Sequence, residues 1–198
     1  MNAANVKNPD ATTISGAEKR EVTRQERKGL QIRDVLLIGI LLAAGAVLKF
    51  FVGSVINFGM KPNFIIAMYC LIIMLTRPGI IEAAIIGLLS GAICQFFPGQ
   101  PYINFVSELL GAAAMCLLIK LPLERIKLPI KPIICTFFST LISGFTFIGV
   151  MYLMYYSGFD IKPTPLAIFM AIIFGTAFIN SVIVQALYIP LKLALKKK

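Results

Sequence analysis

The sequence predicts an all-α membrane protein with six transmembrane helices and both termini in the cytosol. Three observations carry this prediction: a high apolar content, six separate apolar runs, and basic residues gathered on one side of the expected membrane. Of the 198 residues, 58% are hydrophobic, and the mean hydropathy of +0.86 lies well above the usual balance of a soluble domain. We expect one membrane domain over residues 30–198. A polar cytosolic tail, residues 1–29, precedes it. The composition of this tail suits a disordered segment, and we expect it to tolerate truncation.

Six apolar runs follow the tail, and each predicts one helix. They cover residues 35–51, 64–75, 80–97, 103–121, 133–156 and 166–191. The last four are long enough to cross a hydrocarbon core, which needs roughly 20 helical residues. The second is short, so it needs little tilt, a thin bilayer or shielding by its neighbours. Prolines such as Pro78, Pro98 and Pro163 lie between the runs, where helices are expected to stop and start.

The basic residues fix the predicted orientation. With the N-terminus inside, most Lys and Arg residues lie near cytosolic ends of helices: in the tail, at Arg77, in the connector at 120–131 and in the last seven residues. Only Lys49, Lys61 and Lys162 then remain outside. This excess of cytosolic Lys and Arg is the usual signature of topology, and it explains the net charge of +10 without a nucleic-acid partner.

Composition and motifs exclude several functions. The chain has no histidine, so no imidazole can bind a metal or act as a base. The four cysteines lie inside apolar runs without a C-x-x-C spacing, which is typical of buried free thiols. Nucleotide-binding loops, catalytic triads and metal-ligand spacings are missing. We therefore expect no enzyme activity and no cofactor, and any energy from ATP must come from another subunit.

Small residues recur every fourth position on several predicted helices. Such stripes let helix backbones approach closely in lipid, and we expect packing within one subunit for most of them. The stripes are Gly39/Ala43, Ala83/Gly87/Gly91, Ser139/Ser143 and Ala167/Ala171/Gly175. Polar residues on the last run, among them Asn180 and Gln185, are expected to make hydrogen bonds between helices.

The stretch 49–64 interrupts the apolar pattern with two lysines, two asparagines, two glycines and a proline. Irregular backbone cannot face hydrocarbon unsatisfied, so we expect this stretch to form the outer lip of a solute pocket. Glu108 is the one carboxylate well inside an apolar run, and such groups usually face a cavity with a partner. Asn104 lies one turn earlier, on the same face. Glu108 could equally pair with Lys49 or Lys61 only to hold helices together.

A cavity with Glu108 at one end and lysine ammonium groups at the other matches a zwitterion. Lys61, within the irregular stretch, is the favoured carboxylate contact, whereas Lys49 could instead extend to the membrane interface. Aromatic side chains, including Tyr102 and Tyr152, would suit a planar solute or ordinary membrane packing.

The run Gly59-Met-Lys-Pro-Asn63, after a small-residue stripe on the first helix, resembles the TrpP family of bacterial tryptophan transporters. More broadly, the chain resembles substrate-binding S components of energy-coupling factor (ECF) transporters over residues 30–192. The resemblance makes Asn63, where that family usually carries an acidic residue, a candidate substrate contact. S components dock on a partner through Ala-x-x-x-Ala on helix one, and Gly39 and Ala43 form the equivalent here. Internal packing is the alternative for that pair.

This resemblance implies a substrate-binding subunit in the bacterial cell membrane. It would take up tryptophan or a related solute with an ECF transmembrane coupling protein and two cytosolic ATPases. Lys61 would hold the carboxylate, and Glu108 with Asn104 would hold the ammonium. An S component for a vitamin, a stand-alone transporter with Glu108 as its proton-coupling carboxylate, and a membrane assembly factor or enzyme are the alternatives. No convincing inverted repeat, which would favour the stand-alone transporter, is visible.

Overall fold

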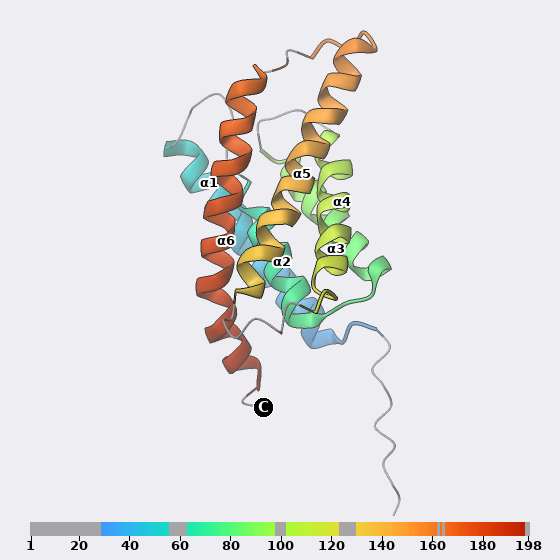
Figure 1. Ribbon diagram of the computed structural model, residues 1–198. Helices are drawn as coiled ribbons and strands as arrows, with labels where there is room; N and C mark the ends of the chain where they lie inside the picture. Colours follow the sequence, from blue (N-terminus) through green and yellow to red (C-terminus); the bar gives the residue numbers. More distant parts are fainter. Residues whose placement is uncertain are drawn as a thin grey trace, which may run out of the picture.

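The computed structural model describes residues 29–55, 63–97, 102–122, 130–161, 163 and 165–196, which form a bundle of helices without strands (Figure 1). The predicted all-helical class is therefore confirmed, while nearly all of the predicted tail lies outside the described residues. The described helices are α1 (Ile32–Val55), α2 (Ile65–Thr76), α3 (Ile80–Cys94), α4 (Ile103–Leu118), α5 (Lys131–Tyr156) and α6 (Leu166–Lys196).

Three of these helices, α1, α5 and α6, are long and apolar enough to cross a membrane. The runs at 80–97 and 103–121 form α3 and α4, which have only 15 and 16 residues, so the expectation that they span by length is not confirmed. At the end of α3, the N–H groups of Phe96 and Phe97 donate to the carbonyls of Ile93 and Cys94. This tightening into i→i−3 bonds ends the α-helix before the apolar run ends. Apolar composition alone does not predict the residue at which the helix ends.

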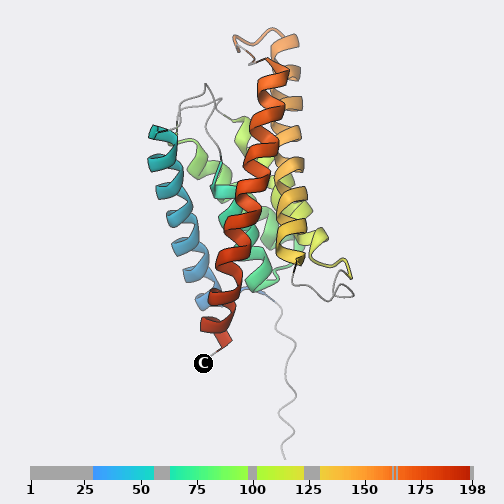
Figure 2. The ribbon, with the colours of Figure 1, turned by 60° about the vertical axis from the view of Figure 1, so that its left-hand side comes forward.

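The short helix α2 lies in the centre of the bundle. Every residue from Ile65 to Met74 is buried, and α2 contacts all five other helices. Figure 2 shows α1 and α6 on either side of it. A helix that is apolar all round is expected to be buried in this way. Shielding by neighbours is thus how the structure accommodates the short second run.

Close approach of α3 and α4 depends on glycine. A Cβ atom at Gly87 would lie 2.6 Å from the backbone oxygen of Glu108, and one at Gly91 would lie 2.9 Å from that of Asn104. The stripe at Ala83/Gly87/Gly91 therefore packs internally as predicted. The stripe at Ala167/Ala171/Gly175 is exposed instead, so the prediction of internal packing is wrong there.

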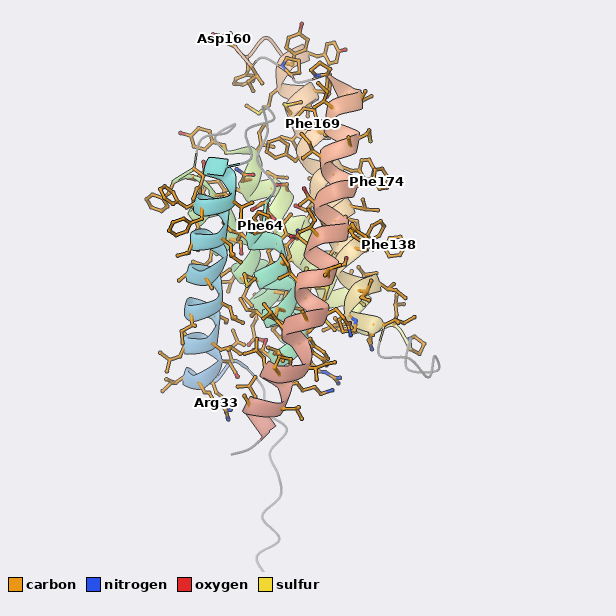
Figure 3. All side chains as sticks on the ribbon, turned by 90° about the vertical axis from the view of Figure 1, so that its left-hand side faces the viewer. Arg33, Phe64, Phe138, Asp160, Phe169 and Phe174 are labelled. Carbon is orange, nitrogen blue, oxygen red and sulfur yellow. The ribbon has the colours of Figure 1, made fainter. Side chains whose placement is uncertain are left out.

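The start of α1 and the end of α6 lie at the same end of the bundle. The guanidinium of Arg33 donates a hydrogen bond to the carbonyl oxygen of Leu195 at 3.1 Å. At this end, Glu82 connects the residue segments before α1 and before α3. Its carboxylate accepts hydrogen bonds from the N–H groups of Leu30 and Gly79 at 3.0 and 2.8 Å. Figure 3 shows Asp160 at the opposite end from Arg33.

Candidate functional site

Polar side chains from four places in the sequence converge inside the bundle, where α2 begins. Lys49 lies near the end of α1, Asn63 precedes α2, Cys94 ends α3, and Glu108 lies in the second turn of α4. Phe64, the neighbour of Asn63, is labelled in Figure 3 where α2 begins between α1 and α6. Because each residue lies close to a helix end, the topology brings them together although the sequence separates them.

The side chain of Lys49 points into the bundle. Its exposed fraction is only 7%, and its Nζ donates a hydrogen bond to the Sγ of Cys94 at 3.2 Å. The same Nζ lies 5.2 Å from the ring centroid of Phe97, a cation–π contact. A thiol and an aromatic ring replace little of the hydration that a buried ammonium loses. Extension of Lys49 to the membrane interface is therefore not what the structure shows.

Glu108 is buried more completely, with an exposed fraction of 1%. One carboxylate oxygen accepts a hydrogen bond from the side-chain amide of Asn63. The other accepts one from the hydroxyl of Ser143 on α5 at 3.2 Å. Both donors are neutral, so the described residues give this carboxyl group hydrogen bonds but no direct ion pair.

Asn63 and Cys94 connect the two charged groups. The Nδ2 of Asn63, which contacts Glu108, also lies 3.6 Å from the Sγ of Cys94, and that sulfur is the hydrogen-bond partner of Lys49. A cation and a carboxyl group thus lie on opposite sides of two neutral side chains, inside a protein core. This arrangement of a buried cation and a buried carboxyl group suits a ligand that carries one negative and one positive charge.

Further buried polar groups surround Glu108. The hydroxyl of Tyr69 on α2 is fully buried, beside the carboxyl group of Glu108 and the hydroxyls of Ser139 and Ser143. It lies against Gly111 of α4, where an added Cβ would meet it at 2.3 Å. On α6, the Nδ2 of Asn180 donates to the backbone oxygen of Asn63 at 3.2 Å. The prediction that Asn180 bonds between helices is confirmed, and the bond connects α6 to the site.

Comparisons with known proteins identify the family of this chain. Residues 31–196 match the family described as "Tryptophan transporter TrpP". The chain belongs to this family of tryptophan transporters. The predicted resemblance is therefore confirmed, and the match covers all six described helices.

One curated relative supports the same family membership. A protein of Clostridium acetobutylicum, described as "Probable tryptophan transport protein", is 25% identical over 170 residues, which is 84% of this chain and 96% of the relative. No solved structure matches the chain significantly. Both sequence findings describe transporters, so they favour transport over catalysis.

For this member of the TrpP family, the structure brings together only some of the residues predicted from sequence. Lys49, Asn63 and Glu108 meet at one place, whereas Lys61 lies outside the described residues. Asn104 lies one turn before Glu108 and is half-buried, but no hydrogen bond among the described residues joins it to this set.

The two tyrosines of the predicted site lie apart from it. Tyr102 is 72% exposed and contributes its backbone N–H to the Oε1 of Gln95 at 3.3 Å. Tyr152 packs against a cluster of buried residues from α4, α5 and α6, and its ring lies 6.4 Å from that of Tyr156.

Sequence reasoning missed the residues that complete the surroundings of Glu108 and Lys49. Cys94 was interpreted as a buried apolar side chain, Ser143 as a packing residue and Asn180 as a link between helices. A signal for two of them existed, since Ser143 and Asn180 are polar residues inside apolar runs. Nothing in the sequence distinguishes Cys94 from the other three buried cysteines.

Proposed function

We propose that this chain is a multi-pass protein of the bacterial cell membrane that captures tryptophan at the outer face, with both termini in the cytosol. The observation that carries the proposal is the pair of buried, oppositely charged groups, Lys49 and Glu108, held apart by neutral Asn63 and Cys94. In this role Lys49 binds the carboxylate of the amino acid, and Glu108 binds its ammonium.

The charge argument favours an amino acid over other solutes. An ion buried with neutral partners alone is costly, and each charge of a zwitterion compensates one of the two. A solute with a single charge satisfies one group and leaves the other uncompensated. A vitamin without an amino-acid head group is therefore the weaker candidate. Asn63, which donates to Glu108, is positioned to contact the same head group.

We further propose that the chain is the substrate-binding S component of an ECF-type transporter. The support is the face of α1 that is not packed against the bundle. Gly39 and Ala43 are both exposed there, and no atom lies within 4 Å of a Cβ built at Gly39. Internal packing leaves this pair unused, so it is free for a transmembrane coupling protein that acts with two cytosolic ATPases. Lys49 is carried on the same helix, which gives the site a direct connection to the docking face.

Titration calorimetry of the detergent-purified chain tests the substrate. We expect tryptophan to bind at micromolar levels or better and B vitamins to give no heat of binding. Tight binding of a vitamin with no binding of tryptophan would overturn the substrate and leave the class of protein standing.

The burial of Glu108 also supports a second candidate, a stand-alone transporter that uses this carboxylate to couple tryptophan to protons. Proteoliposomes that contain this chain alone separate the two. An S component should bind tryptophan there without accumulating it. Uptake that follows an imposed proton gradient, and that stops in Glu108→Gln, would decide for the stand-alone transporter.

A further inference from the structure

The side-chain amide oxygen of Asn180 accepts no hydrogen bond from any described residue. The residue lies in the middle of α6 with an exposed fraction of 0%, and its Oδ1 has no hydrogen-bond partner among the described residues. Its other amide atom, Nδ2, donates to the backbone oxygen of Asn63 at 3.2 Å. A buried acceptor left without a donor costs free energy comparable to a lost hydrogen bond, so its retention here calls for a donor that arrives from elsewhere.

The orientation of this amide is fixed by its neighbour. A backbone carbonyl oxygen can only accept, so the atom of Asn180 that faces the carbonyl of Asn63 must be the donor Nδ2. The Oδ1 atom is therefore directed away from that carbonyl, and it cannot become a donor by rotation as a hydroxyl can. This distinguishes Asn180 from Thr136 and Thr140, whose buried hydroxyls also have no partner among the described residues but can donate as well as accept.

The location of Asn180 connects the unpaired oxygen to the proposed substrate. Asn63 contacts Asn180 through its backbone and Glu108 through its side chain. The acceptor thus lies one residue away from the group proposed to bind the substrate ammonium. Gln185, the other buried amide with an unpaired oxygen, lies further along α6 toward the end that contains Leu195.

Resting on the proposed function, we propose that Asn180 determines the selectivity of the site for tryptophan by accepting the indole N–H through its Oδ1. That N–H is the one hydrogen-bond donor on the tryptophan side chain, and burial of the ring requires an acceptor for it. Amino acids without the donor, such as phenylalanine, leave the Asn180 oxygen unpaired. A site that is built to bond an N–H group discriminates strongly against analogues that lack it.

The test compares tryptophan with 3-benzothienylalanine, in which sulfur replaces the indole N–H and the ring shape is kept. In calorimetric titrations of the full chain, we expect tryptophan to bind at least about tenfold more tightly, the effect of one hydrogen bond. The variant Asn180→Leu, of nearly equal size, should bind the two ligands with equal affinity. Gln185→Leu is the matched control and should keep the full preference.

Two results would overturn the role of Asn180: equal affinities of the wild-type chain for the two ligands, or a full preference for tryptophan in Asn180→Leu. Equal affinities of the wild-type chain need no variant to be measured, so that result overturns the role even where Asn180→Leu does not fold. Failure of tryptophan to bind the wild-type chain at all is a different outcome, because it contradicts the proposed function rather than the role of Asn180.

Discussion

Lys49 is the residue on which the interpretation of the site depends most. Buried lysines are rare unless they are paired, and within a membrane helix an ionisable side chain usually faces a partner or a cavity. Here the described partners are a thiol and an aromatic ring, neither of which carries a full negative charge. The missing anion is what the substrate carboxylate would supply.

Replacing Lys49 by Met keeps an unbranched apolar side chain of nearly the same length and removes the charge. We expect tryptophan affinity to fall roughly 10- to 100-fold, because a hydrogen bond to a charged group contributes about 1.5–3 kcal/mol. Calorimetric titration measures the change. Lys192→Met is the control, since Lys192 lies near the end of α6 against the ring of Tyr188; equal losses in both variants would contradict the role of Lys49.

The charge types at the site could be predicted from sequence, but their neighbours could not. Glu108 is conspicuous as a carboxylate inside an apolar run, and Lys49 as a lysine at the edge of one. That Cys94 lies between them depends on where α3 ends, which hydropathy does not determine. The preference for Lys61 came from its place in an irregular stretch, and that position lies outside the described residues.

Among the elements, α3 and α4 have the closest packing, and the site depends on it. Gly87 lies against the backbone of Glu108 and Leu109, so the two helices hold the carboxylate at a fixed height relative to Cys94. The sequence predicts that Gly87 and Gly91 form a packing face. It does not say that α4 is the helix packed against it, because a stripe of small residues carries no information about its partner.

Gly87→Ala should force α3 and α4 apart. A methyl group there would lie 2.6 Å from a backbone oxygen and 2.8 Å from a backbone Cα, atoms that cannot rotate away. We expect the free energy of unfolding to fall by about 1–3 kcal/mol, measured as a lower midpoint of thermal unfolding in detergent, together with weaker tryptophan binding. The control is Gly149→Ala, where nothing lies within 4 Å of the added atom. A wild-type midpoint for Gly87→Ala would refute this account of the packing.

At the scale of the whole molecule, α1 combines two faces with different tasks. One face directs Lys49 into the core, and another face leaves Gly39 and Ala43 exposed. The end of α1 near Arg33 is held to α6, while the other end is held through Lys49 and Cys94. The proposed site and the proposed docking surface therefore share the helix α1.

The variant with both Gly39→Leu and Ala43→Leu separates binding from transport. Bulky side chains on this face should prevent close approach of a coupling protein, so we expect unchanged calorimetric affinity for tryptophan and loss of labelled tryptophan uptake by cells that express the ATPase module. Gly175→Leu, at an equally open position on α6, should transport normally. Normal uptake by the α1 variant would rule out this face as the docking surface.

The overall arrangement is predictable from sequence only in part. Six apolar runs and their breaks predict six helices, because each run must satisfy its backbone internally. The central position of α2 and the exposure of the Ala167/Ala171/Gly175 stripe are not predictable, because each depends on which other helix occupies the neighbouring space. Runs of similar composition therefore end in different environments.

The central claim is that Lys49 and Glu108 together bind a zwitterion. Its most direct test is a calorimetric comparison of tryptophan with tryptamine, which lacks the carboxylate, and indole-3-propionate, which lacks the ammonium. We predict that the wild-type chain binds tryptophan far more tightly than either analogue. Lys49→Met should bind tryptophan no better than tryptamine, and Glu108→Gln should bind it no better than indole-3-propionate. Undiminished preference for tryptophan in both variants would contradict the claim.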